Sequence, residues 1–463
     1  MPERDRMTPV ELRASIGLAS IFGLRLLGMF VILPVFAIYA EQIPGGTNLT
    51  LVGIALGVYG LTQAILQIPF GWWSDRYGRK RVIYAGLVMF ALGSFVAAAA
   101  ASIYVVIVGR ILQGAGAISA AVMAAAADLT REQHRTKAMA MIGSTIGLSF
   151  AMSLVAGPWL NRHIGVPGIF AMTGVLAIAA MVVVWRIVPS ISDTPAAAGA
   201  SGLREFWRVA ADPQLARLNY GIFALHAVLM ALFIAVPFSL RDAGLPLGEH
   251  WKVYLSVMLG SVVLMVPVIM KQGRPGRLKQ SFVGAVALLL VAHLALPWLT
   301  SSIAQLSFFL LLFFTPFNIL EATLPSLTSR MAPAGSKGVA IGVYSSVQFL
   351  GTFAGAAVGG FVFGRWGMTG VVIVDVVLLV IWLVVAPGMR PPASLSTRTY
   401  TVPTLGPRES EALAAALRDL RGVHDARVDA AECTAYLKVD SARFDEQNVL
   451  QTIAEKGEFG WHP

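Results

Sequence analysis

The chain contains a succession of apolar stretches, each long enough to cross a membrane as a helix. A transmembrane helix needs about 20 predominantly apolar residues, which leaves few folds open other than a bundle of spans. We predict twelve spans in two groups of six. The first six cover residues 12–40, 50–72, 81–101, 103–128, 136–161 and 168–188. The second six cover residues 217–240, 250–270, 280–299, 303–329, 338–364 and 368–387.

The composition agrees with a membrane protein and argues against a soluble enzyme. Hydrophobic residues make up 56% of the chain and charged residues 13%, whereas soluble domains carry about 25% charged residues. No small-residue cleavage site follows the charged residues 1–13, so we expect the first span to stay in the membrane. We find no nucleophile–base constellation and no nucleotide-binding loop, and we therefore expect neither enzymatic activity nor use of ATP.

The basic residues of the loops divide unevenly between the two sides of the membrane. Loops on one side carry arginine and lysine at 76–81, 131–137, 204–217, 271–279 and 330–337. The other side has only Arg162, Arg241, Lys252 and Arg365. Because basic loops stay in the cytoplasm, this asymmetry predicts that both termini are cytoplasmic.

The two groups of spans resemble each other in sequence. The stretch IPFGWWSDRYGRKR aligns with VPVIMKQGRPGRLK, and Pro69 then matches Pro267 while Arg76 matches Arg274. We therefore predict an all-α polytopic membrane protein with twelve helices in two six-helix halves, residues 1–188 and 217–387, joined by a cytoplasmic linker at 189–216.

After Pro391 the sequence turns polar and alternating, which predicts a separate soluble domain at 400–463 behind a linker at 388–399. Strands are expected at 400–404, 422–428 and 434–439, and helices at 409–420 and 444–456. Residues 459–462 are interpreted as a remnant of a fourth strand. The order β-α-β-β-α predicts a small α+β, ferredoxin-like cytoplasmic domain, in which acidic residues outnumber basic ones.

The hairpin GWWSDRYGRKR at 71–81 separates the second and third spans. Its spacing is set by Gly71, Asp75, Arg76, Gly78 and Arg79. It resembles the loop between helices two and three of the major facilitator superfamily, a family of transporters. The resemblance implies a conformational latch in which Asp75 meets the start of the eleventh helix near 337–339 and Arg79 pairs with Asp128. The alternatives are a simple topology anchor for the loop and a surface cap for Asp128.

Three further motifs resemble those of drug/proton antiporters in this superfamily. The fourth span contains R-x-x-Q-G-x-G, with Arg110, Gln113 and Gly114, and in the family this arginine is associated with proton coupling. The first span contains LGMFVILP, with Gly28 and Pro34. The fifth span ends on Gly157 and Pro158, although the two further glycines of the family pattern are missing. Plain helix packing and an arginine held by carbonyl groups are the alternatives.

Several charged or polar residues lie within the apolar spans, where a charge is costly unless it faces a cavity or a partner. Arg25 and Arg110 are the cations, and Asn318, Glu321, His226 and Asp375 could complement them. We expect these six to form the proton-coupling and substrate cavity, with Glu321 either paired with an arginine or protonated. A neutral hydrogen-bonding role for His226 and an interfacial position for Asp375 are the alternatives.

The predicted function is a proton-coupled secondary transporter that exports a small amphipathic organic solute by alternating access. The proton gradient would supply the energy, so no cofactor is expected, and the partners would be lipid, solute and protons but no nucleic acid. Such an antiporter would lie in a bacterial inner membrane. A uniporter that binds an anionic metabolite through Arg25 and Arg110 is an alternative, and so is a receptor that does not transport.

The C-terminal domain resembles the YAM domain of YajR-type transporters, a subgroup of the superfamily. Heavy-metal-associated domains have a similar element order, but this chain lacks their C-x-x-C motif. Cys433, His424 and His462 do not have the spacing of a thiolate site, so we expect no metal. We expect this acidic domain to dock reversibly on the basic cytoplasmic loops of the same chain and to modulate transport.

Overall fold

The computed structural model describes residues 7–189, 202–272, 277–332, 337–389, 395–403, 405–430, 433–440 and 444–457. The chain divides into two compact units, one of residues 1–273 and 279–389, and one of residues 274–278 and 390–463. We refer to them as the membrane domain and the C-terminal domain. In the repeated stretch VPVIMKQGRPGRLK, residues 273–276 with Arg274 lie outside the described residues, and so does the proposed fourth-strand remnant at 459–462.

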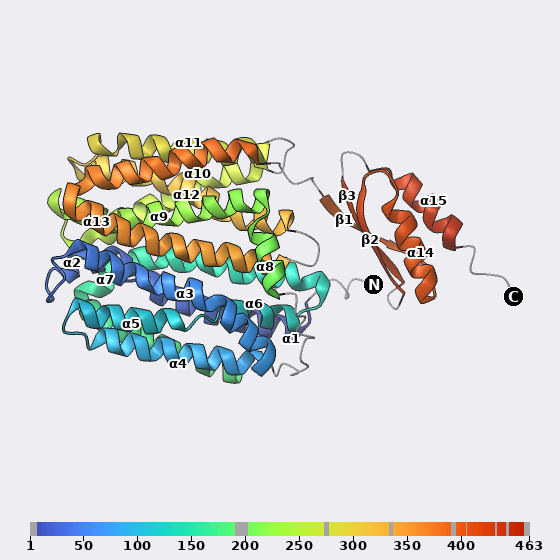
Figure 1. The fold of residues 1–463 in the computed structure, drawn as a ribbon, viewed down its shortest axis with the longest axis horizontal. Coiled ribbons are helices and arrows are strands. Elements are labelled where there is room, and N and C mark those ends of the chain that lie inside the picture. Colours follow the sequence, from blue (N-terminus) through green and yellow to red (C-terminus); the bar gives the residue numbers. More distant parts are fainter. Residues whose placement is uncertain are drawn as a thin grey trace. The chain divides into compact units, whose positions relative to one another are not determined.

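The membrane domain is entirely helical in its described part. Its helices are α1 (Pro9–Phe30), α2 (Leu33–Ala40), α3 (Leu49–Tyr77), α4 (Arg79–Ala98), α5 (Ile103–Ala115), α6 (Ser119–Asp128), α7 (Glu132–Arg186), α8 (Gly202–Ala210), α9 (Pro213–Asp242), α10 (His250–Gln272), α11 (Arg277–Ala295), α12 (Ile303–Met331) and α13 (Lys337–Val385). Three short 3-10 turns are η2 (Leu247–Glu249), η3 (Leu296–Trp298) and η4 (Ala386–Gly388). α13 lies between α9 and α3, with α4 and α5 beyond α3 (Figure 1).

Two of these helices each account for two predicted spans. α7 has 55 residues and α13 has 49, about twice the length that one crossing requires. Each contains one glycine with non-helical backbone angles, Gly165 (φ 66°) and Gly367 (φ 61°). The predicted breaks between spans at 162–167 and 365–367 are therefore present but shorter than expected, each a kink at one glycine. A glycine accepts a positive φ without a Cβ clash, so one residue completes each turn.

The predicted linker at 189–216 is also too long. It contains α8, and α9 begins at Pro213. The Asp212 side chain accepts hydrogen bonds from the backbone N–H groups of Gln214 (2.8 Å) and Leu215 (2.9 Å). An aspartate cap followed by proline is a strong helix start, which is why the helix begins four residues before the apolar run.

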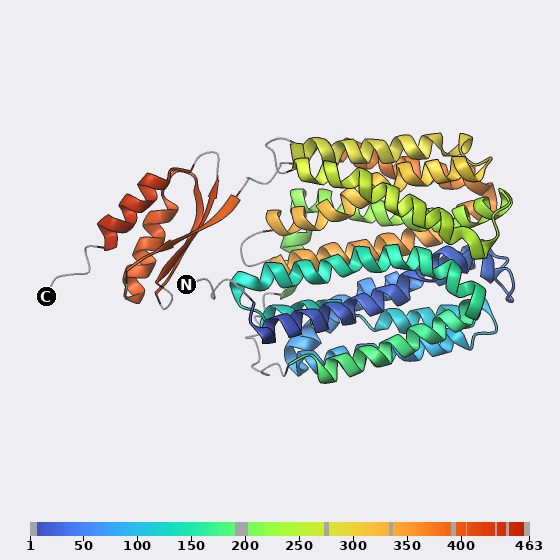
Figure 2. The ribbon, with the colours of Figure 1, turned by 180° about the vertical axis from the view of Figure 1, so that it is seen from behind.

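The two halves of the membrane domain pack closely along α3 and α13. An ideal Cβ atom added to Gly53 or Gly57 of α3 would come within 3 Å of Ala356, and one added to Gly60 would come within 2.6 Å of the Phe349 carbonyl oxygen. On its other side α13 packs equally closely against α9, where Gly355 faces the Ala227 backbone. Small residues allow such backbone contact between helices in a membrane. The view from behind shows a second contact between the halves, where α7 lies next to α10 (Figure 2).

The C-terminal domain contains β1 (Leu395–Thr401), α14 (Pro407–Arg418), β2 (Val423–Asp429), β3 (Thr434–Asp440) and α15 (Glu446–Gly457). The strand order is β1-β3-β2, with β3 antiparallel to both neighbours. This is the split β-α-β arrangement of ferredoxin-like domains, so the predicted α+β fold is confirmed.

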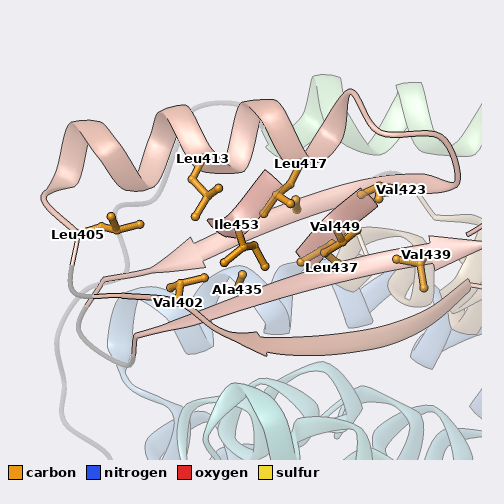
Figure 3. Close-up of a cluster of buried hydrophobic side chains, with 11 residues drawn as sticks. Val402, Leu405, Leu413, Leu417, Val423, Ala435, Leu437, Val439, Val449 and Ile453 are labelled. Carbon is orange, nitrogen blue, oxygen red and sulfur yellow. The ribbon is translucent and has the colours of Figure 1, made fainter. Parts of the chain in front are cut away.

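The helices of the C-terminal domain cover one face of its sheet. Leu413 and Leu417 of α14 pack over Ala435 and Leu437 of β3 (Figure 3). The first strand begins at Leu395, inside the predicted linker 388–399, because residues 395–401 pair in continuous register with β3. The ladder hydrogen bonds thus extend the strand beyond its apolar part.

The packing of α13 on α9 predicts a strong effect of one added methyl group. Gly355→Ala places a Cβ atom about 2 Å from the Ala227 carbonyl oxygen, so the helices must separate. Overpacking of this kind costs about 1–3 kcal/mol, and we expect a clearly lower thermal unfolding midpoint of the detergent-purified protein.

Gly342→Ala is the matched control on the same helix, since a Cβ atom there has no neighbour within 4 Å. Its midpoint should stay the same or rise, because alanine is the better helix former. Equal unfolding midpoints for the two variants would contradict the close packing of α13 on α9.

Candidate functional site

Two arginine side chains lie buried in the first half. Arg25 of α1 is 3% exposed and donates hydrogen bonds to Ser119 Oγ (3.1 Å) and to Gln63 Oε1. Arg110 of α5 is 1% exposed and donates to the carbonyl oxygens of Ala55 (3.3 Å) and Leu56 (3.0 Å). Within the described residues neither guanidinium forms an ion pair with an acid. The two positive charges are therefore held by neutral acceptors alone.

Tyr59 of α3 joins this arginine cluster to the second half. Its ring centroid lies 5.7 Å from the guanidinium carbon of Arg25 and 4.9 Å from that of Arg110. The electron-rich face of a tyrosine ring stabilises such cations. The same ring contacts Phe349 of α13 edge-on, with centroids 6.4 Å apart. The cluster thus lies at the seam between the halves.

The fourth span is interrupted beside these arginines. α5 ends at Ala115 and α6 begins at Ser119, whose hydroxyl accepts from both Arg25 and Gln63 (3.3 Å). Gln113 binds Arg110 (3.0 Å) and donates to Ser94 (2.8 Å). Interrupted membrane helices expose polar backbone and are typical of substrate sites in transporters.

The first and fifth spans meet at a second interruption. α1 ends at Phe30 and α2 begins at Leu33, with Pro34 in its first turn. A Cβ atom added to Gly157 would lie 2.4 Å from the Val31 carbonyl oxygen and 2.9 Å from Pro34. The motifs that contain Pro34 and Gly157–Pro158 are therefore one packed unit.

The other motif glycines of the first half also mark close helix contacts. Gly28 of α1 faces Thr173 of α7, where an added Cβ atom would lie 3.1 Å from the threonine side chain. Gly114 faces the Tyr59 backbone, with 2.4 Å between its added Cβ atom and the tyrosine carbonyl oxygen. These contacts are what plain helix packing requires.

A second polar cluster lies on the opposite side of the seam. The amide nitrogen Nε2 of Gln348 lies 2.9 Å from His226 Nε2 and 3.4 Å from Glu321 Oε1. His226 Nδ1 lies 3.3 Å from the Ile222 carbonyl oxygen. Because a carbonyl oxygen only accepts, Nδ1 carries the hydrogen and Nε2 accepts from Gln348. Gln348 thus connects Glu321 and His226, and it precedes Phe349, the residue that contacts Tyr59.

Of the two states expected for Glu321, paired with an arginine or protonated, the structure does not show the arginine pair. In the described residues its ionisable neighbour is His226, whose Nε2 atom lies 3.8 Å from Oε2, and not Arg25 or Arg110. Asn318 donates to Ser261 Oγ of α10 (3.0 Å), so it does not share a partner with Glu321. Residues three apart on a helix differ by about 60° in direction, which lets α12 present Asn318 to α10 and Glu321 to α9 and α13.

Asp375 belongs to neither cluster, because it contacts none of the other five residues expected to share its cavity. It is fully buried on α13, and its Oδ2 atom lies 3.6 Å from Nε2 of His293 on α11. Tertiary packing, which sequence position alone does not reveal, places these two residues together.

The residues of the predicted latch converge at the end of the membrane domain where α3 meets α4, which we call the basic end. Arg79 forms ion pairs with Asp75 and, at 2.9 Å, with Asp128. Gly78 has φ 93°, a left-handed conformation that favours glycine and allows the turn between the helices. The expected pair of Arg79 and Asp128 is present. In the described residues Asp75 forms no hydrogen bond with α13.

The other members of this hairpin lie at its surface. Arg76 stacks over the rings of Trp72 (5.5 Å) and Tyr77 (5.9 Å). Gly71 lies against α6, where an added Cβ atom would be 3.4 Å from Ala120. Both halves of the hairpin thus pack within the first six spans.

An ion pair connects the two halves at the opposite end of the bundle. Arg241, at the end of α9, donates to Glu41 Oε2 over 2.6 Å, next to the end of α2. The close contacts of Gly53, Gly57 and Gly60 with α13 lie in the same part of α3. The halves are thus held together at this end.

The sequence analysis missed Tyr59, Gln63, Ser119, Gln348 and His293. Of these five, Gln63 was the easiest to recognise from the sequence, because Gln63 and Gln67 stand four residues apart in an apolar span and so share a helix face. Tyrosine and serine occur too often in membrane helices to stand out. His293 was recognisable only as an isolated histidine, and its partner is 82 positions away.

Residues 18–356 match the Major Facilitator Superfamily. The chain belongs to this superfamily. It is 43% identical to the inner membrane transport protein YajR of Escherichia coli (strain K12) over 452 residues, which cover 97% of this chain and 99% of YajR. It is 26% identical over 375 residues to multidrug resistance protein MdtH of Cronobacter sakazakii (strain ATCC BAA-894), covering 77% of this chain and 90% of MdtH.

Solved structures of the same superfamily share the fold. The crystal structure of the human organic anion transporter MFSD10 (TETRAN) matches 82% of this chain and 100% of its own, with a TM-score of 0.63 and 19% identity. The predicted resemblance to the superfamily and to YajR-type transporters is confirmed. The protein is an integral membrane transporter and not an enzyme, and the small C-terminal α+β domain fits the description of a YAM domain.

Proposed function

We propose that this protein is a proton-coupled secondary transporter that exports a small amphipathic organic solute by alternating access. The observation that carries the proposal is the placement of Glu321. Its carboxyl group lies among α9, α12 and α13 of the second half, beside His226 and Gln348, and its Oε2 atom has no hydrogen-bond partner among the described residues. A carboxyl group inside a membrane protein that is neither ion-paired with arginine nor fully hydrogen-bonded is suited to bind a proton.

The surroundings of Glu321 suit reversible binding of a proton. Its side chain is 20% exposed, so it is within reach of water when the site opens. Gln348 donates to Oε1 of the carboxyl group while His226 lies next to Oε2, and these two residues come from α13 and α9. Any movement between those helices changes what Glu321 contacts, which couples its proton to the conformation.

Alternating access requires that the seam opens at one end while it is closed at the other. We infer that the conformation described here is the one closed at the end of Glu41 and Arg241 and opening at the basic end. By the bias of basic loops toward the cytoplasm, the basic end is then cytoplasmic and so are both termini. The protein would lie in a bacterial inner membrane and use the proton gradient without a cofactor. The multidrug resistance proteins among its relatives favour an amphipathic solute and export.

A uniporter for an anionic solute is the second candidate. The observation in its favour is that Arg25 and Arg110 have no acidic partner among the described residues. Two buried positive charges held by neutral groups would attract a carboxylate or phosphate. In this case solute movement would not carry protons.

The exchange Glu321→Gln separates the two candidates. Glutamine keeps the shape and hydrogen bonding but cannot ionise, so solute-linked proton flux should fall by about tenfold or more, corresponding to ~1.4 kcal/mol or more, while solute binding persists. The measurement is proton flux into proteoliposomes loaded with a pH-sensitive dye while a panel of fluorescent amphipathic dyes is supplied. Glu249→Gln, an exposed carboxyl group in η2, is the control and should behave like the wild type. Unchanged pH dependence in Glu321→Gln would overturn proton coupling at this residue.

We further propose that Asp75, Arg79 and Asp128 act as a latch at the basic end. In the conformation described they contact one another within the first half. When the basic end closes, Asp75 would meet the first turn of α13, where the positive end of the helix dipole favours an anion. This accounts for the absence of a contact between Asp75 and the described part of α13 in a conformation that opens at this end.

The latch predicts that Asp75→Asn weakens closure and lowers transport without preventing folding. A partly exposed ionic contact of this kind is worth about 0–1 kcal/mol, so the populations of the two states should shift by up to about fivefold. Spin labels on Lys137→Cys and Arg330→Cys, in a Cys433→Ser background, report the separation of the halves at the basic end. The latch is refuted if Asp75→Asn transports at the wild-type rate and its distance distribution matches that of the Glu249→Gln control.

We also propose that the C-terminal domain modulates transport by docking reversibly on the basic loops. It has its own buried core and need not contribute to the fold of the membrane domain. Removing the residues after Arg390 should therefore leave a folded transporter with altered but measurable transport. Purification yield, unfolding midpoint and dye transport of the truncated protein test this. A truncated protein that fails to fold, or full-length protein that shows no crosslink between the domain and the loops at low salt, would disprove modulation by docking.

A further inference from the structure

The most unusual polar contact outside the proposed transport site is that between Asp375 and His293. Both residues are fully buried, and the Asp375 Oδ2 and His293 Nε2 atoms are 3.6 Å apart. Both oxygens of Asp375 and Nε2 of His293 lack a hydrogen-bond partner among the described residues. Unpartnered polar atoms at such depth are costly, so the pair requires a physical account.

The other ring nitrogen of His293 determines which proton positions are open. Nδ1 lies 2.7 Å from the Leu289 carbonyl oxygen, which only accepts, so Nδ1 carries a hydrogen in every protonation state of the pair. In a neutral imidazole Nε2 then presents a lone pair toward Asp375. If Asp375 were ionised at the same time, a lone pair would face a carboxylate and a net negative charge would be buried without compensation.

A proton between the two groups removes this conflict. With one proton, the pair is either a carboxylic acid that donates to Nε2 or a carboxylate that accepts from an imidazolium, and both forms are neutral overall. With two protons, the imidazolium charge would be buried without a counter-ion. Apolar surroundings penalise any net charge, and only the state with one proton avoids it.

The neighbouring helices supply no other charge to the pair. His293 packs edge-on against the rings of Phe309 (6.0 Å) and Phe313 (5.7 Å) of α12. The other ionisable residues described on the surrounding helices are Arg277 and Lys279 on α11, Arg217, Tyr220, His226, Arg241 and Asp242 on α9, Glu321 and Arg330 on α12, and Tyr344 and Arg365 on α13. None of these forms an ion pair with Asp375 or His293, and Tyr220 donates to the Leu378 carbonyl oxygen (3.0 Å).

We propose that Asp375 and His293 form a second proton-binding site, which holds one proton between Oδ2 and Nε2 and clasps α11 to α13. The proton moves between an O–H and an N–H bond, and no other bond changes. The separation of 3.6 Å needs only a small rotation to reach the hydrogen-bond distance of about 2.8 Å. The site is distinct from Glu321, since the two share no contact residue, and it stands whether or not transport is coupled to protons.

The test is to determine how many protons the Asp375–His293 pair holds, using the full-length protein in lipid nanodiscs. Infrared difference spectra show whether Asp375 is a carboxylic acid, through a carbonyl band that Asp375→Asn removes. Nitrogen spectra of protein labelled with ¹⁵N-histidine show whether His293 Nε2 carries a hydrogen, with His293→Gln identifying the signal. If Asp375→Asn does not fold, ¹³C-aspartate labelling of the wild type identifies the band, because Asp375 is the buried aspartate among the described residues.

We expect one proton at pH 7, seen either as a carboxylic acid with bare Nε2 or as a carboxylate with a doubly protonated ring. Glu321→Gln should leave these signals unchanged, which separates this site from the proposed transport site. A carboxylate beside a bare Nε2, or a carboxylic acid beside a doubly protonated ring, would overturn the proposal. Loss of the signals in Glu321→Gln would also overturn it, because the two sites would then not be distinct.

Discussion

The structure of the membrane domain depends on how polar groups are accommodated away from water. A charge in hydrocarbon is stable only with a partner, and the chain meets this requirement in three different ways. Arg110 is held by backbone carbonyl groups of α3 and Arg25 by the side chains of Gln63 and Ser119, while Asp375 lies beside the imidazole of His293. Each of these contacts joins helices that are separate in sequence.

Glycine seams allow these clusters to meet at the centre of the molecule. Along α3 and α13 the backbones approach so closely that a single Cβ atom would collide with the neighbouring helix. This packing brings Tyr59 against Phe349, and with them the arginine cluster of one half and the Glu321 cluster of the other. Because helices in a membrane are held by packing and hydrogen bonds rather than by the hydrophobic effect, such a seam can exchange contacts at little cost.

The two ends of the seam differ in a way that suits a transporter. Glu41 and Arg241 connect the halves at one end, whereas the charges of Asp75, Arg79 and Asp128 are satisfied within one half at the other. Surface ion pairs of this kind contribute about 0–1 kcal/mol each, so they bias a conformational equilibrium without freezing it. Interruptions at α1–α2 and α5–α6 add backbone polarity near the buried arginines.

The sequence alone was sufficient for the membrane class, the twelve crossings, the two halves and the β-α-β-β-α order of the C-terminal domain. These features follow from local properties, since the length of a hydrophobic run and the alternation of a strand depend only on residues that are close in sequence. It was also sufficient for the pairing of Arg79 with Asp128, because the family motif that contains Arg79 implies that contact.

Only the tertiary structure decided which buried groups face each other. Glu321 was expected to be paired with an arginine or protonated, and it lies beside His226 and Gln348, while Asp375 lies beside His293, a residue that no local pattern distinguished. A contact of this kind depends on helix rotation and on the depth at which two helices pass each other. Those quantities arise from the packing of the whole bundle, and a change of one residue in register turns a side chain by about 100°.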